Sequence, residues 1–247
     1  MPQRRPVRAK TVLITGAARR IGRALAMDLA AHGWAVAVHY RHSEQDAAAV
    51  VQEISNAGGR AASFQADLAD IPALPTLVTK VADELGAPTC LINNASEFML
   101  DSAETLNEAT WDAHLDINLK APVFLAQAVV NHLPDDEPGN IINIIDQRVW
   151  KLTPDFFSYT ISKAGLWTAT RTLAQGLAPR VRVNAIGPGP TLRSVHQTDA
   201  DFEAETRSTL LKTGPSPQDI AAAVRFILAT PSMTGQMIAL DDGQHLT

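Results

Sequence analysis

The feature that most constrains this chain is a regular alternation of short apolar runs with longer amphipathic segments. The runs at 11–15 and 141–145 are rich in β-branched residues, which is typical of buried strands. Between such runs lie segments with apolar residues at helical spacing, as at Ile21, Leu25 and Leu29. Strands that alternate with helices form a parallel sheet covered on both faces. The sequence therefore predicts an α/β fold built on a doubly wound parallel sheet.

No linker, repeat or low-complexity block divides the 247 residues, so we expect a single domain over 1–247. Strands are expected at 11–15, 34–40, 60–65, 89–92, 141–145, 181–185 and 237–240, and helices from 21 to before Gly33 and at 43–56, 72–85, 111–131, around Tyr159 to 177, and 218–229. Residues 1–9 are expected to form a loose basic tail. The polar stretch at 192–217 has no predicted strand, and we expect it to be a substrate loop or lid over the carboxyl ends of the strands.

Composition excludes several classes of function. The net charge of -5 gives no reason to expect a nucleic-acid partner, and no apolar run reaches the ~18 to 20 residues that span a bilayer. The single cysteine, Cys90, cannot form an internal disulfide, which indicates a reducing compartment, and a cytoplasmic location is the default expectation. The histidines show no paired metal-ligand spacing, so no metal is expected.

A glycine-bearing turn at 16–22 follows the first strand and opens the first helix. Free amides at such a helix N-terminus can bind the phosphates of a dinucleotide. Enzymes that use NAD usually place an acidic residue at the end of the second strand, whereas this chain has Arg41 and Ser43 there, with Arg19 and Arg20 in the turn. Because guanidinium groups bind phosphate through paired hydrogen bonds, we expect NADPH. A solvated basic loop is the alternative interpretation.

A tyrosine and a lysine four residues apart, Tyr159 and Lys163, lie on one face of a predicted helix. An ammonium in this position can stabilise a phenolate and lower a pKa that starts near ~10, so the phenol can act as an acid or base. Asp146 ends the preceding strand on the side where open parallel sheets bind ligands. A surface tyrosine beside a solvated lysine is the alternative for this pair taken alone.

Several motifs stand in the order found in short-chain dehydrogenases/reductases, and together they cover nearly the whole chain. They are Thr15-Gly16 with Gly22, Asn93-Asn94-Ala95, Asn118, Tyr159 with Lys163, and Gly187-Pro188-Gly189. The chain resembles this family, which implies a Rossmann fold, a dinucleotide cofactor and a homotetramer. The resemblance also implies that Tyr159 donates a proton, that Lys163 lowers its pKa and holds the nicotinamide ribose, and that Asn118 maintains a water link to the lysine.

The same resemblance implies a cofactor site drawn from the ends of the first four predicted strands, from the helix of Tyr159 and from the turn after 187. Its expected members are Gly16, Arg19, Arg20, Ile21, Gly22, Tyr40, Arg41, His42, Ser43, Asp67, Leu68, Asn94, Ala95, Ser96, Tyr159, Lys163, Pro188, Gly189 and Thr191.

Two positions depart from the usual pattern of the family. Position 20 is Arg where the family has Gly, and position 146 is Asp where it has a Ser that donates a hydrogen bond to a substrate carbonyl. A carboxylate cannot donate unless it is protonated, and it repels a developing oxyanion. Reduction of an ordinary ketone is therefore disfavoured. An aspartate is better suited to accept hydrogen bonds from a substrate rich in N–H groups, or to pass a proton.

Both departures occur together in pteridine reductases and dihydromonapterin reductases. This chain resembles them in TGAARRIG at 15–22, HYRHS at 39–43 and NNASEF at 93–98. That resemblance implies that Phe98 stacks on a pterin ring opposite the nicotinamide, that Ser96 contacts both ligands, and that Arg20 lies by the pyrophosphate and the pterin edge. The substrate residues expected are Arg20, Ser96, Phe98, Asp146 and Tyr159, while Trp150, Phe156 and Phe157 are candidates for the pocket wall or for plain packing.

We therefore expect an NADPH-dependent reductase of a pterin-like small molecule, with Tyr159 as proton donor assisted by Asp146. Two alternatives stay open: a reductase of keto or ketoacyl substrates in which Asp146 is incidental, and a non-catalytic NADPH sensor. The intact Tyr159, Lys163 and Asn118 favour an enzyme over a sensor.

Overall fold

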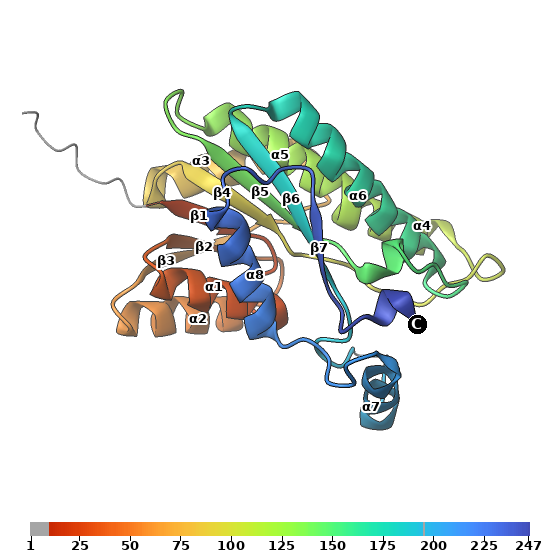
Figure 1. Cartoon of the computed structure of the whole chain (residues 1–247). Coiled ribbons are helices and arrows are strands. Elements are labelled where there is room, and N and C mark those ends of the chain that lie inside the picture. The colour runs from red at the N-terminus through yellow and green to blue at the C-terminus, as the bar shows by residue number, and fades with distance from the viewer. Residues whose placement is uncertain (1–9, 195) are drawn as a thin grey trace, which may run out of the picture.

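The strands form one parallel sheet in the order β3-β2-β1-β4-β5-β6-β7 (Figure 1). The computed structural model describes residues 10–194 and 196–247, so the tail expected at 1–9 lies outside the described residues. The predicted doubly wound sheet is confirmed, because every pair of neighbouring strands is parallel. The strands are β1 Thr11–Ile14, β2 Ala35–Tyr40, β3 Arg60–Gln65, β4 Pro88–Asn93, β5 Gly139–Ile144, β6 Val181–Pro188 and β7 Met237–Leu240.

Helices cover both faces of the sheet, with α1, α2 and α8 on one side and α3 to α6 on the other (Figure 1). They are α1 Arg20–Ala31, α2 Glu44–Asn56, α3 Leu74–Leu85, α4 Glu108–Leu115, α5 Ala121–His132, α6 Phe157–Leu177, α7 Asp199–Ser208 and α8 Pro217–Ala229. Short 3₁₀ turns lie at Ile71–Ala73, Gln147–Val149 and Gln244–Leu246. No helix among the described residues is long and apolar enough to cross a membrane.

The core has one layer on each face of the sheet, and successive strand residues enter opposite layers. In β1, Val12 and Ile14 pack toward α1 and α8, while Leu13 packs toward α3 and α5. Because helices cover both faces of the sheet, all the residues of β1 are buried and its sequence is mostly apolar. After β1 the chain builds outward to β3 and then returns to β4 on the other side of β1. This reversal opens a crevice at the carboxyl ends of β1 and β4, where such sheets bind ligands.

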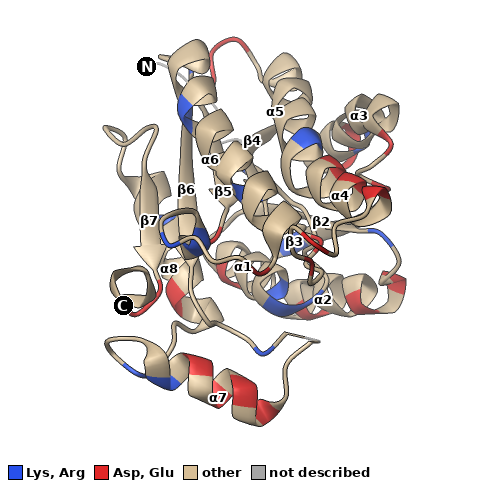
Figure 2. Ribbon diagram, turned by 90° about the vertical axis from the view of Figure 1, so that its right-hand side faces the viewer, with Lys and Arg blue, Asp and Glu red and all other residues tan. Residues whose placement is uncertain are grey.

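Two segments differ from the sequence prediction. The helix expected at 111–131 is interrupted by a π-helical turn at Asp116–Lys120, which contains Asn118. Pro122 follows this turn and has no N–H to donate to the carbonyl of Asn118, so a regular helical ladder cannot pass through it. The stretch at 192–217 contains a helix, α7, whose first turn is closed by a capping box between Thr198 and Asp201. Helix α7 is acidic and protrudes from the body of the molecule (Figure 2).

Candidate active site

A cavity of about 980 Å³ opens at the carboxyl ends of the strands, a size that accommodates a small ligand or a cofactor. Every residue predicted for the cofactor or the substrate lines this cavity except Asp67, and the predicted catalytic residues line it except Asn118. The structure also adds Gln147, Arg148 and His196 to its wall. The fold therefore brings the residues predicted from the sequence together at the carboxyl ends of the strands.

The glycine turn after β1 is held by a buried histidine, His39. The Gly16 N–H donates to His39 Nδ1 at 3.1 Å, and His39 Nε2 lies 3.2 Å from the Ala66 carbonyl. This arrangement assigns the proton to Nε2, because Nδ1 must accept. Burial lowers the pKa of His39 to about 4. No role was predicted for His39 from the sequence, although a polar residue near the carboxyl end of β2, beside the glycine turn, is a signal that could have found it.

Close packing explains the glycine at position 22. A Cβ on Gly22 would lie 2.2 Å from the Gly16 carbonyl oxygen. Asn94 completes the turn, since its Nδ2 donates to the Thr15 carbonyl at 2.9 Å and to the Gly16 carbonyl at 3.2 Å. The Thr15 hydroxyl in turn accepts the Asn94 N–H at 2.9 Å and the Ala95 N–H at 3.0 Å. These bonds join the ends of β1 and β4 into one rigid floor.

The arginines predicted to bind phosphate are engaged with protein groups in this structure. Arg19 Nε donates to Asp46 Oδ2 at 2.6 Å, and Arg41 Nη1 lies 2.8 Å from Glu97 Oε1. Both pairs are partly exposed to solvent, so each is worth at most about 1 kcal/mol. A phosphate can therefore compete for these guanidinium groups at small cost.

Arg20 contacts the stretch that was expected to form a lid. Its Nη1 donates to the Arg193 carbonyl at 2.9 Å and its Nη2 to the Leu192 carbonyl at 3.0 Å. The backbone of Arg20 has φ of 54°, in the left-handed region where glycine is favoured. An arginine in place of glycine therefore strains the backbone at this position, and its side chain connects the first turn to the segment 192–217 through two hydrogen bonds.

Tyr159 and Asp146 lie in direct contact at the cavity. The Tyr159 hydroxyl donates to Asp146 Oδ2 at 2.9 Å, and the Arg148 N–H donates to Asp146 Oδ1 at 2.8 Å. Lys163 is buried below them, where its Nζ donates to the Ile144 carbonyl at 2.9 Å and lies 5.7 Å from the centre of the tyrosine ring. A phenol, a carboxyl group and an amine thus meet at one wall of the cavity.

The charges at this wall correct one expectation from the sequence. Burial, the negative charge of Asp146 and the hydrogen bond to it raise the pKa of Tyr159 well above its usual value. The net shift is upward although Lys163 lies close by, and burial lowers the pKa of that amine to about 8. Burial also raises the pKa of Asp146, against the opposing effects of the Arg148 N–H and charge. The phenol therefore keeps its proton at neutral pH, which suits a donor rather than a base.

Asn118 lies behind the cavity and binds the main chain of the loop after β4. Its Oδ1 accepts from the Glu97 N–H at 2.8 Å and from the Ser96 hydroxyl at 3.1 Å. Its Nδ2 donates to the Glu97 carbonyl at 2.9 Å and to the Ser162 hydroxyl at 3.1 Å. This side chain therefore orients Ser96 and Glu97, while the water link implied by the resemblance remains a prediction.

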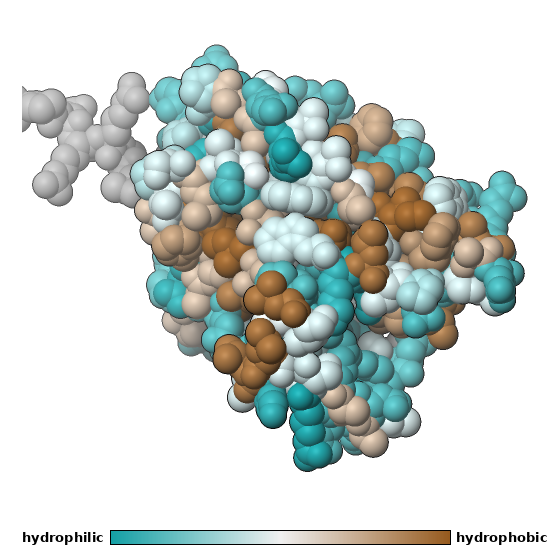
Figure 3. Space-filling model, turned by 45° about the vertical axis from the view of Figure 1, so that its right-hand side comes forward, coloured by the Kyte–Doolittle hydropathy of each residue, from teal (hydrophilic) through white to brown (hydrophobic). Residues whose placement is uncertain are grey.

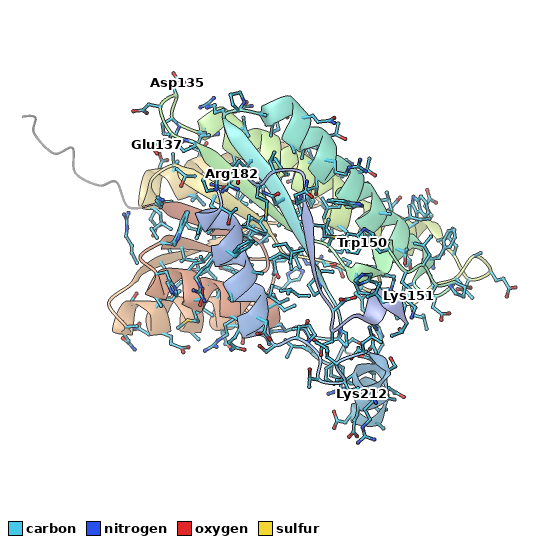
Figure 4. All side chains as sticks on the ribbon, viewed as in Figure 1. Asp135, Glu137, Trp150, Lys151, Arg182 and Lys212 are labelled. Carbon is cyan, nitrogen blue, oxygen red and sulfur yellow. The ribbon has the colours of Figure 1, made fainter. Side chains whose placement is uncertain are left out.

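Phe98 lies beside the phenol of Tyr159, while its stacking on a pterin ring stays a prediction. Its ring centre is 4.7 Å from that of Tyr159 in an edge-to-face arrangement, and 4.3 Å from that of Phe156 in a parallel stack. Phe156 lines the cavity, whereas Trp150 and Phe157 are not among the lining residues. Trp150 instead packs on His245 at 5.2 Å, next to the C-terminal turn (Figure 4).

One side chain that the sequence did not single out carries an unused polar atom. Gln147 is 5% exposed, lines the cavity, and its Oε1 has no partner among the described residues. A buried acceptor of this kind is costly unless a ligand satisfies it. Its position directly after Asp146, at a strand end, is the signal in the sequence that could have found it.

The chain is similar to known proteins over its full length. A model of the short chain dehydrogenase family matches residues 10–204. The chain belongs to this family. The structure of FolM alternative dihydrofolate reductase 1 from Brucella canis, complexed with NADP, is 49% identical with a TM-score of 0.95, covering 98% of this chain and 96% of that one. The predicted family and its fold are thereby confirmed.

More distant relatives carry other activities. A 3-oxoacyl-[acyl-carrier-protein] reductase, FabG, from Staphylococcus aureus is 31% identical over 96% of this chain and 98% of its own length. A short chain dehydrogenase from Burkholderia cenocepacia, in complex with NADP, is 35% identical with a TM-score of 0.88, covering 95% of this chain and 97% of that one. The oxidoreductase class is common to all of them.

Proposed function

We propose that this protein reduces a pterin-like ring, such as a dihydropteridine, with NADPH. The observation that carries this proposal is the hydrogen bond of 2.9 Å between Tyr159 and Asp146, in a cavity that Phe98 also lines. A carboxyl group at this position accepts from ring and amino N–H groups, and it does not favour an oxyanion. The Brucella canis neighbour, whose name includes dihydrofolate reduction, supports a substrate with this ring system.

The residues at the wall have distinct roles in the proposed reaction. NADPH, when bound, supplies the hydride. Tyr159 holds a proton that burial and Asp146 keep on its oxygen, and it donates this proton to the reduced ring directly or through water. Asp146 binds the N–H edge of the ring and, because its pKa is raised, passes a proton more readily than an exposed carboxylate. The ammonium of Lys163 holds the nicotinamide ribose.

The arrangement of cations supports NADPH over NADH. Arg41 and Arg19 lie at the cavity beside Ser43, and no acidic residue ends β2. Arg41 and Arg19 would hold a 2′-phosphate there in place of their present partners, Glu97 and Asp46. The NADP complexes of the Brucella canis and Burkholderia cenocepacia neighbours support the same cofactor.

The test is NADPH oxidation by the purified protein with dihydropterins, simple ketones and 3-oxoacyl thioesters as separate substrates. Turnover of a dihydropterin that is faster than turnover of every ketone supports the proposal. Brisk ketone reduction with no pterin turnover refutes it.

A reductase of ketoacyl substrates is the second candidate, and the similarity to the Staphylococcus aureus reductase favours it. Under this alternative Asp146 is incidental, and Asp146→Ser raises ketone reduction because a hydroxyl can donate to a carbonyl oxygen. Under the pterin proposal the same substitution removes the acceptor for ring N–H groups and lowers pterin turnover. The sign of the change separates the two candidates.

We also propose that 192–217 closes over the bound substrate, and that the chain assembles as a cytoplasmic homotetramer. Arg20 supports the first proposal because it bonds two carbonyls of the segment. Apolar side chains at the surface, including Phe124 on α5 and Ile161 on α6, support an assembly. The face in Figure 3 shows exposed apolar groups among polar ones. Sedimentation equilibrium tests the tetramer.

A further inference from the structure

A buried chain of hydrogen bonds connects the loop that carries Phe98 to the helix that carries Tyr159. The His114 Nδ1 lies 2.7 Å from the Ser158 hydroxyl, and that hydroxyl donates to Asp101 Oδ2. The Met99 N–H donates to His114 Nε2 at 3.0 Å. Asp101, His114 and Ser158 are each at most 2% exposed. No other part of the proposed mechanism uses these side chains.

The direction of the chain is fixed at its first bond. Because the Met99 N–H can only donate, His114 Nε2 must accept, and the ring proton lies on Nδ1. Nδ1–H then donates to the Ser158 oxygen, whose own proton points to the Asp101 carboxylate. Burial lowers the pKa of His114 and so favours its neutral form. The charges of Asp101 and Glu97 raise this pKa, and the charge of Lys163 lowers it further.

Asp101 also caps helix α6 from a distance of 57 residues in the sequence. Phe156, the residue at the N-cap, has no side chain that can accept an amide, and its φ is 56°. The Ser158 N–H donates instead to the Asp101 oxygens at 3.2 and 3.3 Å, and the Phe157 N–H donates to the Asp101 carbonyl at 3.3 Å. The partial positive charge at the start of a long helix stabilises this buried carboxylate.

The bonded atoms lie one residue from groups proposed to act on the substrate. Ser158 precedes Tyr159, and Met99 follows Phe98. A shift of the helix start relative to the loop would therefore move the phenol away from Asp146 or from the Phe98 ring. We infer that Asp101, Ser158 and His114 are positioning residues, which hold the Tyr159 phenol against Asp146 and beside Phe98.

The variant that tests this is Ser158→Ala, which removes the hydroxyl shared by Asp101 and His114. We expect a kcat that falls ~10- to 100-fold with an unchanged Kd for NADPH, because a small misplacement of a reacting group carries a cost of that order. The matched control is Thr170→Val. Thr170 is another fully buried hydroxyl on α6, which accepts from Asn143 away from the cavity, and we expect its loss to leave kcat unchanged.

A second readout needs no substrate. The chain has two tyrosines, so Tyr40→Phe leaves Tyr159 as the single titrating phenol. In this background Ser158→Ala should give a ~3-fold larger phenolate fraction at a fixed alkaline pH, measured by near-ultraviolet absorbance, because the phenol loses contact with Asp146 and gains water. The activity readout rests on the proposed function, whereas this titration does not, so the two can fail separately.

An unchanged kcat with an unchanged titration overturns the inference, and so does an equal loss of kcat in Thr170→Val. If Ser158→Ala does not fold, Asp101→Asn carries the same two expectations, because it keeps the shape of the cap and removes its charge. Parent-like values for both measurements in that variant overturn the inference in the same way.

Discussion

Acid should destabilise this protein through His39. Protonation would place a hydrogen on Nδ1, which now accepts the Gly16 N–H at 3.1 Å. The pKa of this histidine is about 4 in the folded protein, below the ordinary value of 6.5. Between these two values the unfolded chain binds more protons than the folded one. The free energy of unfolding therefore falls as the pH is lowered through this window, and the full contribution is present above pH 6.5.

The magnitude follows from the difference between the two pKa values. With about 1.4 kcal/mol for each pH unit, His39 contributes about 3 kcal/mol that is lost by pH 4. This is a large part of the stability of an ordinary domain. The side chain is 2% exposed, so solvent screening does not reduce the figure much. The pKa of buried His114 is also lowered, and its contribution has the same sign.

The assay is urea unfolding at a series of pH values between 6.5 and 4 for the parent, His39→Asn and His32→Asn. Asparagine places an acceptor oxygen near the position of Nδ1 and does not titrate. We expect the loss of stability across the window to shrink by about 3 kcal/mol in His39→Asn. His32, whose side chain is 48% exposed, serves as the control and should leave the loss as in the parent. Equal pH dependence in the parent and in His39→Asn would refute the reasoning.

Three further predictions concern the cavity. Tyr159→Phe should lower kcat ~100- to 10,000-fold while NADPH titration gives the parent Kd, since only the proton donor is lost; parent activity in this variant would exclude the phenol as donor. Activity should fall as the pH rises through about 8, because the Lys163 ammonium loses its proton there, and a pH–rate profile that is flat across this value would contradict that role. Gly22→Ala should abolish NADPH binding measured by fluorescence, because its Cβ would lie 2.2 Å from the Gly16 oxygen.

Local patterns carried much of the information about the fold. The alternation of apolar runs and helical segments predicts the sheet. A strand that is apolar throughout must be covered on both faces, and each amphipathic helix buries its one apolar face against the sheet. The π-helical turn around Asn118 escaped the prediction of one long helix, even though Pro122 marks it. A proline interrupts the regular i to i−4 hydrogen bonds of a helix. The residues on both sides of it still favour helix, so the pattern predicts one continuous helix. Helix α7 was missed because its sequence is acidic and has no apolar face.

For the site, the motif spacings and the family resemblance together indicated which side chains meet. Glycines at 16 and 22 follow a predicted strand and open a predicted helix, and Tyr159 and Lys163 share one face of another helix. What each group does there was less predictable. The pKa of Tyr159 is raised, since the effects of burial and of Asp146 exceed the opposing effect of the Arg148 charge. Burial is a property of the whole fold, so no local pattern reports it.

The amino-acid sequence by itself determined the order of strands and helices, the glycine turn, and the presence of a phenol, an amine and a carboxyl group at one edge of the sheet. Tertiary structure decided which partners those groups take, as in the cap that Asp101 provides to a helix starting 56 positions later. Hydrogen bonds and charges act through space over a few ångströms, and only folding brings residues so distant in the chain within that range.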